Sequence, residues 1–283
     1  YVGILLFLFC SLGQGLLIGL GMALNARHEG LDYRTYVMMG DGEMAEGSVW
    51  EAAALAAHER VDNLIGFVDC NRLGQAGPAL HAHECERYAD KFKAFGWHAV
   101  VIDGHDIAAI IGAIQQAQAV KGQPSVIVAH TIKGHGISDV QDRIGFHGKP
   151  FKADELSTLI ALLNERFKVQ ASSAATADVK PPLPAVRSLK SISTAAALHL
   201  DLGLDPYASF FAVGKKISTR KAFGYALATL GRRSDKVFAL DGDVSTSTYA
   251  DRVAQKHPNR FFECKIAEQN MVSVAAGLEA AGK

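Results

Sequence analysis

The sequence carries almost no net charge. Its 283 residues include 29 lysines and arginines against 29 aspartates and glutamates. A balanced chain presents no strong field that would attract nucleic acid or an anionic lipid surface, so we expect neither as a partner.

Cysteines are also few. Cys10, Cys70, Cys85 and Cys264 form neither a CxxC pair nor the dense framework of a small secreted domain. We therefore expect reduced thiols in a cytoplasmic protein, each serving as a small buried apolar side chain.

Long apolar runs are absent except at the start. Tyr1–Cys10 is almost wholly apolar and leads into Leu16–Leu24, which taken alone resembles a signal segment or a membrane span. No basic segment precedes this run, however, and Ser11 and Gly13–Gly15 interrupt it. We expect no membrane association, and we expect a fragment of a longer protein because the first residue is not methionine.

Two short β-type runs, Tyr36–Met39 and Leu64–Val68, enclose an alanine-rich segment with helical spacing. Strand, helix and strand in this order form a βαβ unit with parallel strands. Asp41, within Gly-Asp-Gly, follows the first strand, and Asn71 follows the second. Because ligands bind at the carboxyl ends of parallel strands, we expect Asp41 and Asn71 to lie in one crevice.

The rest of the chain continues the alternation. The apolar spacing predicts helices at Ser11–Arg27, Val49–His58, Ala89–Phe95, Ile107–Val120, Ala153–Phe167, Thr219–Gly231, Asp251–His257 and Glu268–Ala281, and further strands at Trp97–Ile102, Ser125–Ala129, Val237–Leu240 and Phe261–Cys264. A capping box, Ser48-x-x-Glu51, marks the second helix. This order predicts an α/β fold with a doubly wound parallel sheet.

A stretch rich in alanine, serine and proline, Val169–Ser193, has the composition of a linker. We therefore expect a nearly complete first domain at residues 1–165, a linker at 166–215 and the start of a second domain at 216–283.

Several motifs together resemble transketolases. Gly40-Asp41-Gly42, then a helix, then a strand ending at Asn71, is similar to the diphosphate-and-magnesium motif of thiamine-diphosphate enzymes. Three sequence motifs resemble transketolase specifically: Ser-Leu-Gly-Gln-Gly at 11–15, Asn-Arg-Leu-Gly-Gln at 71–75 and Ile-Ala-Glu-Gln-Asn at 266–270. The resemblance covers nearly the whole chain from Ser11 onward. The resemblance implies a thiamine-diphosphate-binding fold, with the second domain binding the pyrimidine ring.

The resemblance also implies a metal site. Mg²⁺, or another divalent cation such as Ca²⁺ or Mn²⁺, would be held by the side chains of Asp41 and Asn71 and by the carbonyl of Leu73, since these ions prefer oxygen ligands. Read without the resemblance, Gly-Asp-Gly is only a turn and Asn71 a strand-end cap. Further residues that the resemblance places against the cofactor are Gly13, Gly40, Gly42, Glu43, Gln75, Lys133, Asp243 and Glu268.

Glu268 resembles the glutamate that hydrogen-bonds the aminopyrimidine ring and promotes removal of the thiazolium proton. Such a shared proton favours a buried carboxyl with a raised pKa. The plainer alternative is a glutamate in the first turn of a helix, where the macrodipole favours it.

Substrate contacts are implied for His147, Arg220 and Ser247. The histidine would reach the substrate oxygen and transfer protons, and the arginine and serine would hold a sugar phosphate. Phe146 replaces the family's usual tryptophan, and Glu46 resembles a residue at the subunit interface. His135 stands where the family more often has arginine, and we assign it no role.

The implied activity is that of transketolase, which moves a two-carbon ketol unit from a ketose phosphate to an aldose phosphate in the pentose phosphate pathway. The resemblance implies a homodimer with shared active sites, so we expect little turnover from this segment alone. Two alternatives stay open, namely a non-catalytic transketolase-like protein that binds cofactor or partner subunits, and a deoxyxylulose-phosphate synthase-type enzyme.

Overall fold

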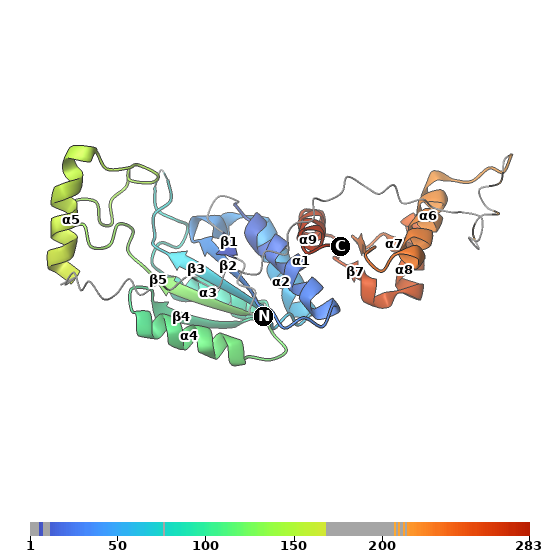
Figure 1. Cartoon of the computed structure of the whole chain (residues 1–283), viewed down its shortest axis with the longest axis horizontal. Helices are drawn as coiled ribbons and strands as arrows, with labels where there is room; N and C mark the ends of the chain where they lie inside the picture. Colours follow the sequence, from blue (N-terminus) through green and yellow to red (C-terminus); the bar gives the residue numbers. More distant parts are fainter. Residues whose placement is uncertain are drawn as a thin grey trace, which may run out of the picture. The chain divides into compact units, whose positions relative to one another are not determined.

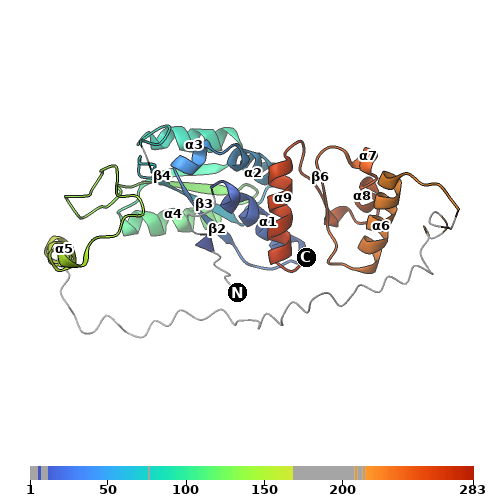
Figure 2. The ribbon, with the colours of Figure 1, turned by 90° about the horizontal axis from the view of Figure 1, so that it is seen from above.

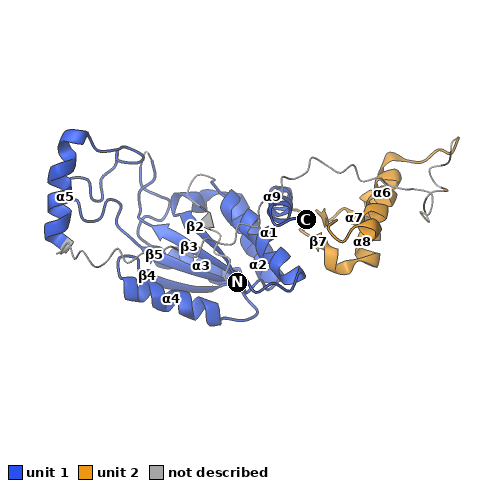
Figure 3. Ribbon diagram, in the orientation of Figure 1, with its two compact units in different colours: residues 1–170, 267–282 blue, residues 171–266, 283 orange. Residues whose placement is uncertain are grey.

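A computed structural model describes residues 6–7, 12–75, 77–167, 207, 209, 212 and 214–283 (Figure 1). Cys10, Ser11 and the expected linker Val169–Ser193 lie outside these residues. The chain divides into two compact units, residues 1–170 with 267–282, and residues 171–266 with 283 (Figure 3). Each unit is described by itself.

The first unit is built on a parallel five-stranded sheet with the order β1-β2-β3-β5-β4. The central strand β3 pairs with β2 on one side and with β5 on the other. The strands are β1 Leu6–Phe7, β2 Thr35–Gly40, β3 Leu64–Cys70, β4 His98–Asp103 and β5 Ser125–His130. The expected parallel α/β fold is therefore confirmed, and the structure adds β1, which the sequence pattern did not predict.

Helices cover both faces of this sheet, as a doubly wound fold requires. The helices of the first unit are α1 Gln14–His28, α2 Gly47–His58, α3 Cys85–Ala94, α4 Ile107–Ala119, α5 Ala153–Phe167 and α9 Glu268–Ala280. In Figure 2, α2 and α3 lie along one side of the sheet and α4 along the other.

The alternation of side chains along each strand explains the two layers. Tyr36, Ile65 and Ile127 pack with Ala113 and Ala117 of α4 on one face. On the other face, the indole N–H of Trp97 donates to the carbonyl of Ala53 in α2 at 2.8 Å. Strands β2–β5 thus all contribute apolar side chains to the layer that contains α4.

The capping box predicted at Ser48 and Glu51 does not form. α2 begins at Gly47 with Glu46 as its N-cap, and no side chain caps it. The Glu51 carboxylate instead accepts the backbone N–H of Asn270, at the start of α9, at 3.2 Å. A carboxylate near a helix N-terminus is stabilising, so Glu51 caps a helix far away in the sequence rather than its own.

α9 packs closely against α1. A Cβ built on Gly277 would clash with the carbonyl oxygen of Ile18 and lie 3.0 Å from the Cα of Gly21. A Cβ built on Gly21 would clash with the carbonyl oxygen of Val274. The two glycines therefore allow the helix backbones to approach more closely than any side chain would permit.

The second unit contains a smaller α/β arrangement in which strands β6 and β7 pair in parallel. Its elements are α6 Thr219–Arg233, β6 Ala239–Asp241, α7 Ser245–Thr248, α8 Asp251–Lys256, a 3₁₀-helix Pro258–Arg260 and β7 Phe261–Glu263. The predicted order of helix, strand, helix and strand is confirmed.

Within the described ranges, no helix is long and apolar enough to cross a membrane. α1, which continues the apolar start of the sequence, has 15 residues. A membrane-spanning helix needs about 20.

We expect Gly277→Ala to destabilise the first unit by about 1–3 kcal/mol, because the added methyl group must force α9 away from α1. Urea unfolding followed by tryptophan fluorescence measures this, since both tryptophans, Trp50 and Trp97, belong to the first unit.

Gly112→Ala is the matched control. Gly112 lies in α4, and no atom stands within 4 Å of its Cβ position. This change should stabilise the helix by up to about 1 kcal/mol. Equal stability of Gly277→Ala and the natural chain would contradict the close packing of α1 and α9.

Candidate functional site

The carboxyl ends of β2 and β3 lie side by side, and each is followed by a buried polar residue, Asp41 and Asn71. The Asp41 carboxylate accepts the backbone N–H of Arg72 at 2.6 Å, and the backbone N–H of Asp41 donates to the carbonyl of Asp69 at 3.2 Å. The two oxygen donors named from the sequence therefore lie at the same edge of the sheet, in neighbouring turns.

Asn71 is held in place by Asp69. The amide Nδ2 of Asn71 donates to Asp69 Oδ2 at 3.0 Å, and its Oδ1 accepts the backbone N–H of Leu73 at 3.2 Å. The other oxygen of Asp69 accepts the hydroxyl of Thr131, which directly follows β5. One carboxylate thus joins the ends of β3 and β5 and fixes which way the Asn71 amide points.

Lys133 reaches this cluster from the loop after β5. Its Nζ donates to the carbonyl oxygen of Leu73 at 2.7 Å and lies 3.4 Å from Nδ1 of His147. The structure therefore brings together four residues that the sequence singled out for metal, cofactor and substrate binding, namely Asn71, Leu73, Lys133 and His147.

The electrostatics of the cluster favour a cation. Burial raises the pKa of Asp41 above its usual 3.8, although the backbone N–H groups of Arg72 and Gly42 oppose the shift. The Asp69 carboxylate raises this pKa further, and the ammonium of Lys133 lowers it. Because burial penalises the charged form, a nearby positive charge stabilises the Asp41 carboxylate.

We call the Asp41 carboxylate, the Asn71 side-chain oxygen and the Leu73 carbonyl the oxygen cluster. It offers one charged and two neutral oxygens, the ligand type that Mg²⁺ prefers. The ammonium of Lys133 already bonds to one of them. These donors fit a divalent cation.

Glu43, two residues after Asp41, accepts hydrogen bonds from the backbones of two glycines. Its carboxylate accepts the backbone N–H of Gly13 at 2.8 Å and that of Gly40 at 3.2 Å. Gly13 has a φ of 83°, and a Cβ there would lie 2.6 Å from the Ser48 hydroxyl, so no side chain fits. Because both oxygens of Glu43 hold backbone amides, its contact with a cofactor stays a prediction.

Glu268 differs from the expectation. It is the first residue of α9, and in the single chain it is exposed rather than buried. The physical reason is the orientation of the first turn, in which Asn270 is fully buried and its N–H is capped by Glu51. The catalytic role of Glu268 stays a prediction, as does the cofactor contact of Gln75, which is also exposed.

Three predicted residues belong to the second unit. Asp243 has a φ of 66°, and its backbone N–H donates to Glu263 at 3.0 Å. Arg220 lies in the first turn of α6 and Ser247 lies in α7, both exposed. Their roles stay predictions.

Sequence reasoning missed the residues that support the oxygen cluster. Asp69 and Thr131 orient Asn71, and Arg72 pairs with Asp142 at 2.5 Å, which joins the turn after β3 to the loop that carries Lys133. The only sequence signal for Asp69 was its position two residues before Asn71.

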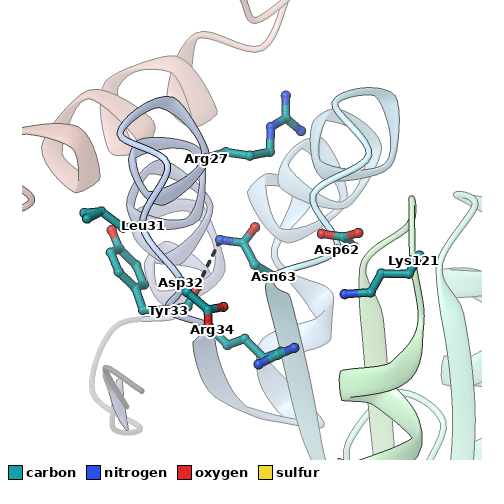
Figure 4. A pocket seen from close by; sticks show the side chains of 8 residues that line it. All are labelled: Arg27, Leu31, Asp32, Tyr33, Arg34, Asp62, Asn63 and Lys121. Carbon is teal, nitrogen blue, oxygen red and sulfur yellow. Dashed lines mark hydrogen bonds between the residues drawn. The ribbon is translucent and has the colours of Figure 1, made fainter. Parts of the chain in front are cut away.

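A pocket of about 170 Å³ lies at the opposite, amino-terminal edge of the sheet (Figure 4). Its charged groups serve local structure, since Asp62 accepts the N–H of Gly122 at 3.0 Å and Arg34 donates to the carbonyl of Gln118 at 3.4 Å. It is lined by Arg27, Leu31, Asp32, Tyr33, Arg34, Asp62, Asn63 and Lys121. None of these residues belongs to the predicted site.

The raised pKa of Asp41 predicts a pH effect on stability. The Asp41 carboxyl contributes favourably to the free energy of unfolding below pH 3.8, which is its pKa in the unfolded chain. This contribution is lost as the pH rises through the higher pKa of Asp41 in the folded chain. In cation-free buffer, the stability of Asp41→Asn relative to the natural chain should therefore increase from about pH 4 to about pH 7. Urea unfolding at several pH values measures this, and a difference that is independent of pH would contradict it.

Comparison with known proteins identifies the family of both parts of the chain. The family model for the transketolase thiamine-diphosphate-binding domain matches residues 10–180, and that for the transketolase pyrimidine-binding domain matches residues 215–283. A solved transketolase from Pichia stipitis in complex with sedoheptulose-7-phosphate has a similar fold, with a TM-score of 0.68 and 23% identity over 95% of this chain and 46% of that one.

Curated relatives give the same family. The chain is 42% identical to transketolase of Homo sapiens over 94% of its own length and 40% of the relative's. It is 40% identical to transketolase-like protein 2 of Homo sapiens over 96% of its own length and 42% of the relative's. The chain thus spans less than half the length of these relatives, and it belongs to the transketolase family.

Proposed function

We propose that this chain binds thiamine diphosphate together with Mg²⁺ or a similar divalent cation such as Ca²⁺ or Mn²⁺. As part of a homodimer with shared active sites, it serves the transfer of a two-carbon ketol unit between sugar phosphates. The observation that carries the proposal is the oxygen cluster of Asp41, Asn71 and Leu73, with the ammonium of Lys133 bonded to its carbonyl.

The oxygen cluster would hold the cation. A divalent ion there would share its remaining positions with phosphate oxygens, as Mg²⁺ usually does. It would also relieve the desolvated carboxylate of Asp41, whose pKa is raised by burial. Because Lys133 already donates to Leu73, its ammonium would move toward a phosphate when the cation takes that carbonyl.

Backbone groups would receive the rest of the diphosphate. Gly13 precedes α1, whose N-terminus favours a negative charge. Glu43 keeps Gly13 next to Gly40, and the absence of side chains at Gly40 and Gly42 leaves space for a ligand. We propose that Gln75 completes the cofactor contacts of this domain.

The bound cofactor supplies the electron sink that lets a carbon–carbon bond beside a carbonyl break. His147 is the residue proposed to move protons at the substrate oxygen, and it lies 3.4 Å from Lys133. Glu268 is proposed to hold the pyrimidine ring, and Asp243 to face the cofactor.

Arg220 and Ser247 are proposed to bind the sugar phosphate. We further propose that residues 1–165 form the diphosphate-binding domain, that 166–215 form a linker, and that 216–283 begin the pyrimidine-binding domain. The proposed compartment is the cytoplasm, since Cys70 and Cys85 are free thiols.

A non-catalytic role is the second candidate. The chain matches 42% of the length of transketolase-like protein 2 and 40% of the length of transketolase, so it is similar to both kinds of relative. Such a protein would keep the oxygen cluster and bind cofactor or partner subunits without turnover.

Calorimetric titration tests the binding. Thiamine diphosphate should bind the natural chain in the presence of Mg²⁺, and its affinity should fall by at least about tenfold for Asp41→Asn or when the metal is chelated. Failure to bind with Mg²⁺ present would contradict the proposed function.

Asp62→Asn is the matched control. Asp62 also accepts a backbone N–H, that of Gly122, but at the other edge of the sheet. Its replacement should leave cofactor affinity within about twofold of the natural value, which separates loss of the cation site from general loss of a carboxylate.

A ketol-transfer assay tests whether the chain alone turns over substrate. We expect the 283-residue chain to bind cofactor but to show less than about a hundredth of the turnover of a full-length transketolase, because a misplaced or incomplete site loses that much or more. Rates equal to those of a full-length enzyme would overturn this expectation and exclude the non-catalytic role.

A further inference from the structure

One histidine just after β4 holds both ends of a tight turn in the loop that follows β5. The Nε2 atom of His105 accepts the backbone N–H of Ile132 at 2.8 Å. The ring of His135 stacks on the ring of His105, with the ring centroids 3.9 Å apart and the planes inclined by 19°. His105 thus contacts the first and the last residue of the turn at residues 132–135.

The turn is closed by a hydrogen bond of its own. The backbone N–H of His135 donates to the carbonyl of Ile132 at 3.1 Å, and Gly134 has a φ of 71°. A positive φ at the third residue of a turn favours glycine. Lys133 is the second residue of this turn, so the residues that His105 holds also fix the position of Lys133.

Lys133 connects the turn to the predicted cofactor site. Its Nζ donates to the carbonyl oxygen of Leu73 at 2.7 Å and lies 3.4 Å from Nδ1 of His147. The carbonyl of Lys133 accepts the backbone N–H of Asp142 at 2.9 Å, which ties the turn to the rest of the loop. His105 therefore supports, from outside the oxygen cluster, the side chain that reaches it.

We propose that His105 is a positioning residue for Lys133. Its neutral imidazole holds the turn, and proton uptake by His105 releases the turn and weakens binding of the diphosphate. The first half stands on the contacts of His105 with the turn. The second half rests on the proposed function, because it concerns affinity for thiamine diphosphate and Mg²⁺.

The hydrogen bond to the turn requires a neutral ring. Nε2 accepts an N–H only when it carries no proton, so His105 holds the turn as the Nδ1–H tautomer. A proton added at Nε2 would turn this atom into a donor that faces another donor, and the hydrogen bond would be lost. Histidine is the side chain that ordinarily changes charge between about pH 5 and pH 8, so the turn should loosen as the pH falls through this range.

The groups around the two stacked rings favour a proton on His105 rather than on His135. Burial lowers the pKa of His135, and the charges of His105 and of Arg166 in α5 lower it further, against the effect of Asp103. Two exposed carboxylates flank His105 in the sequence, namely Asp103, which accepts its backbone N–H at 2.8 Å, and Asp106, which caps α4. His105 is therefore the ring of the pair that takes up the proton.

NMR spectroscopy of the whole chain tests the contact. Long-range ¹⁵N–¹H correlations should show His105 as the Nδ1–H tautomer at about pH 8, and the Ile132 amide signal should shift with the same pH midpoint as the His105 ring. In His105→Gln, whose side-chain oxygen accepts an N–H but takes up no proton, the Ile132 amide should show no such midpoint. A neutral His105 in the Nε2–H tautomer, or an Ile132 signal that does not follow His105, would overturn the proposal.

Calorimetry with thiamine diphosphate and Mg²⁺ tests the consequence. At about pH 8, His105→Ala should bind about fivefold more weakly than the natural chain, as expected for one lost hydrogen bond, and His105→Gln should bind within about twofold of it. Between about pH 8 and about pH 5.5, the natural chain should lose about fivefold more affinity than His105→Gln. Comparing the two chains at each pH cancels the protonation of the diphosphate and of Asp41.

His58→Gln is the matched control. His58 is an exposed histidine at the end of α2, and its replacement should leave the affinity and its pH dependence like those of the natural chain. Natural affinity in His105→Ala would contradict the positioning role of His105. Equal pH dependence of His105→Gln and the natural chain would contradict the role of the proton.

The proposed function and the role of His105 can fail separately. Absence of cofactor binding by the natural chain at every pH would overturn the proposed function, and with it the effect of His105 on affinity. The NMR spectra would still decide whether the neutral ring of His105 holds the turn.

Discussion

The parallel pairing of β2 with β3 is the constraint on which the rest of the site depends. With Gly40 opposite Asp69, the two strands end at the same level, and the turns that follow them are fastened by the hydrogen bond between Asp41 and the backbone of Arg72. A shift of one residue in this register would turn the side chains at the strand ends to opposite faces. The register therefore decides whether Asp41, Asn71 and Leu73 can serve one ion.

This arrangement has an electrostatic cost. Burial raises the pKa of both Asp41 and Glu43, so the charged forms of these two carboxylates are less stable in the folded chain than in water. Hydrogen bonds from backbone amides and the ammonium of Lys133 offset part of that cost. The proposed cation would be stabilised by the charge that the fold has desolvated.

The end of β3 carries more than one function. Asp69 orients Asn71 and reaches Thr131, the buried Cys70 thiol lies 3.3 Å from the carbonyl of Ala82, and Asn71 is the predicted metal ligand, all within three consecutive residues. Residues that follow one another in a strand point to opposite sides, so the Cys70 thiol faces the segment before α3 while its neighbours face the other way.

The sequence alone determined the order of the elements and the position of the oxygen cluster. Apolar runs and helical spacing are local properties, so β2, β3, α4 and α5 were predicted to within a few residues, and the rule for parallel sheets placed Asp41 beside Asn71. Only the tertiary structure assigned Glu51 to Asn270, 219 residues away, and joined Asp69 to Thr131. It also left Glu268 exposed. These contacts depend on how helices and loops pack across the chain, and no local periodicity encodes the distance between side chains on different elements.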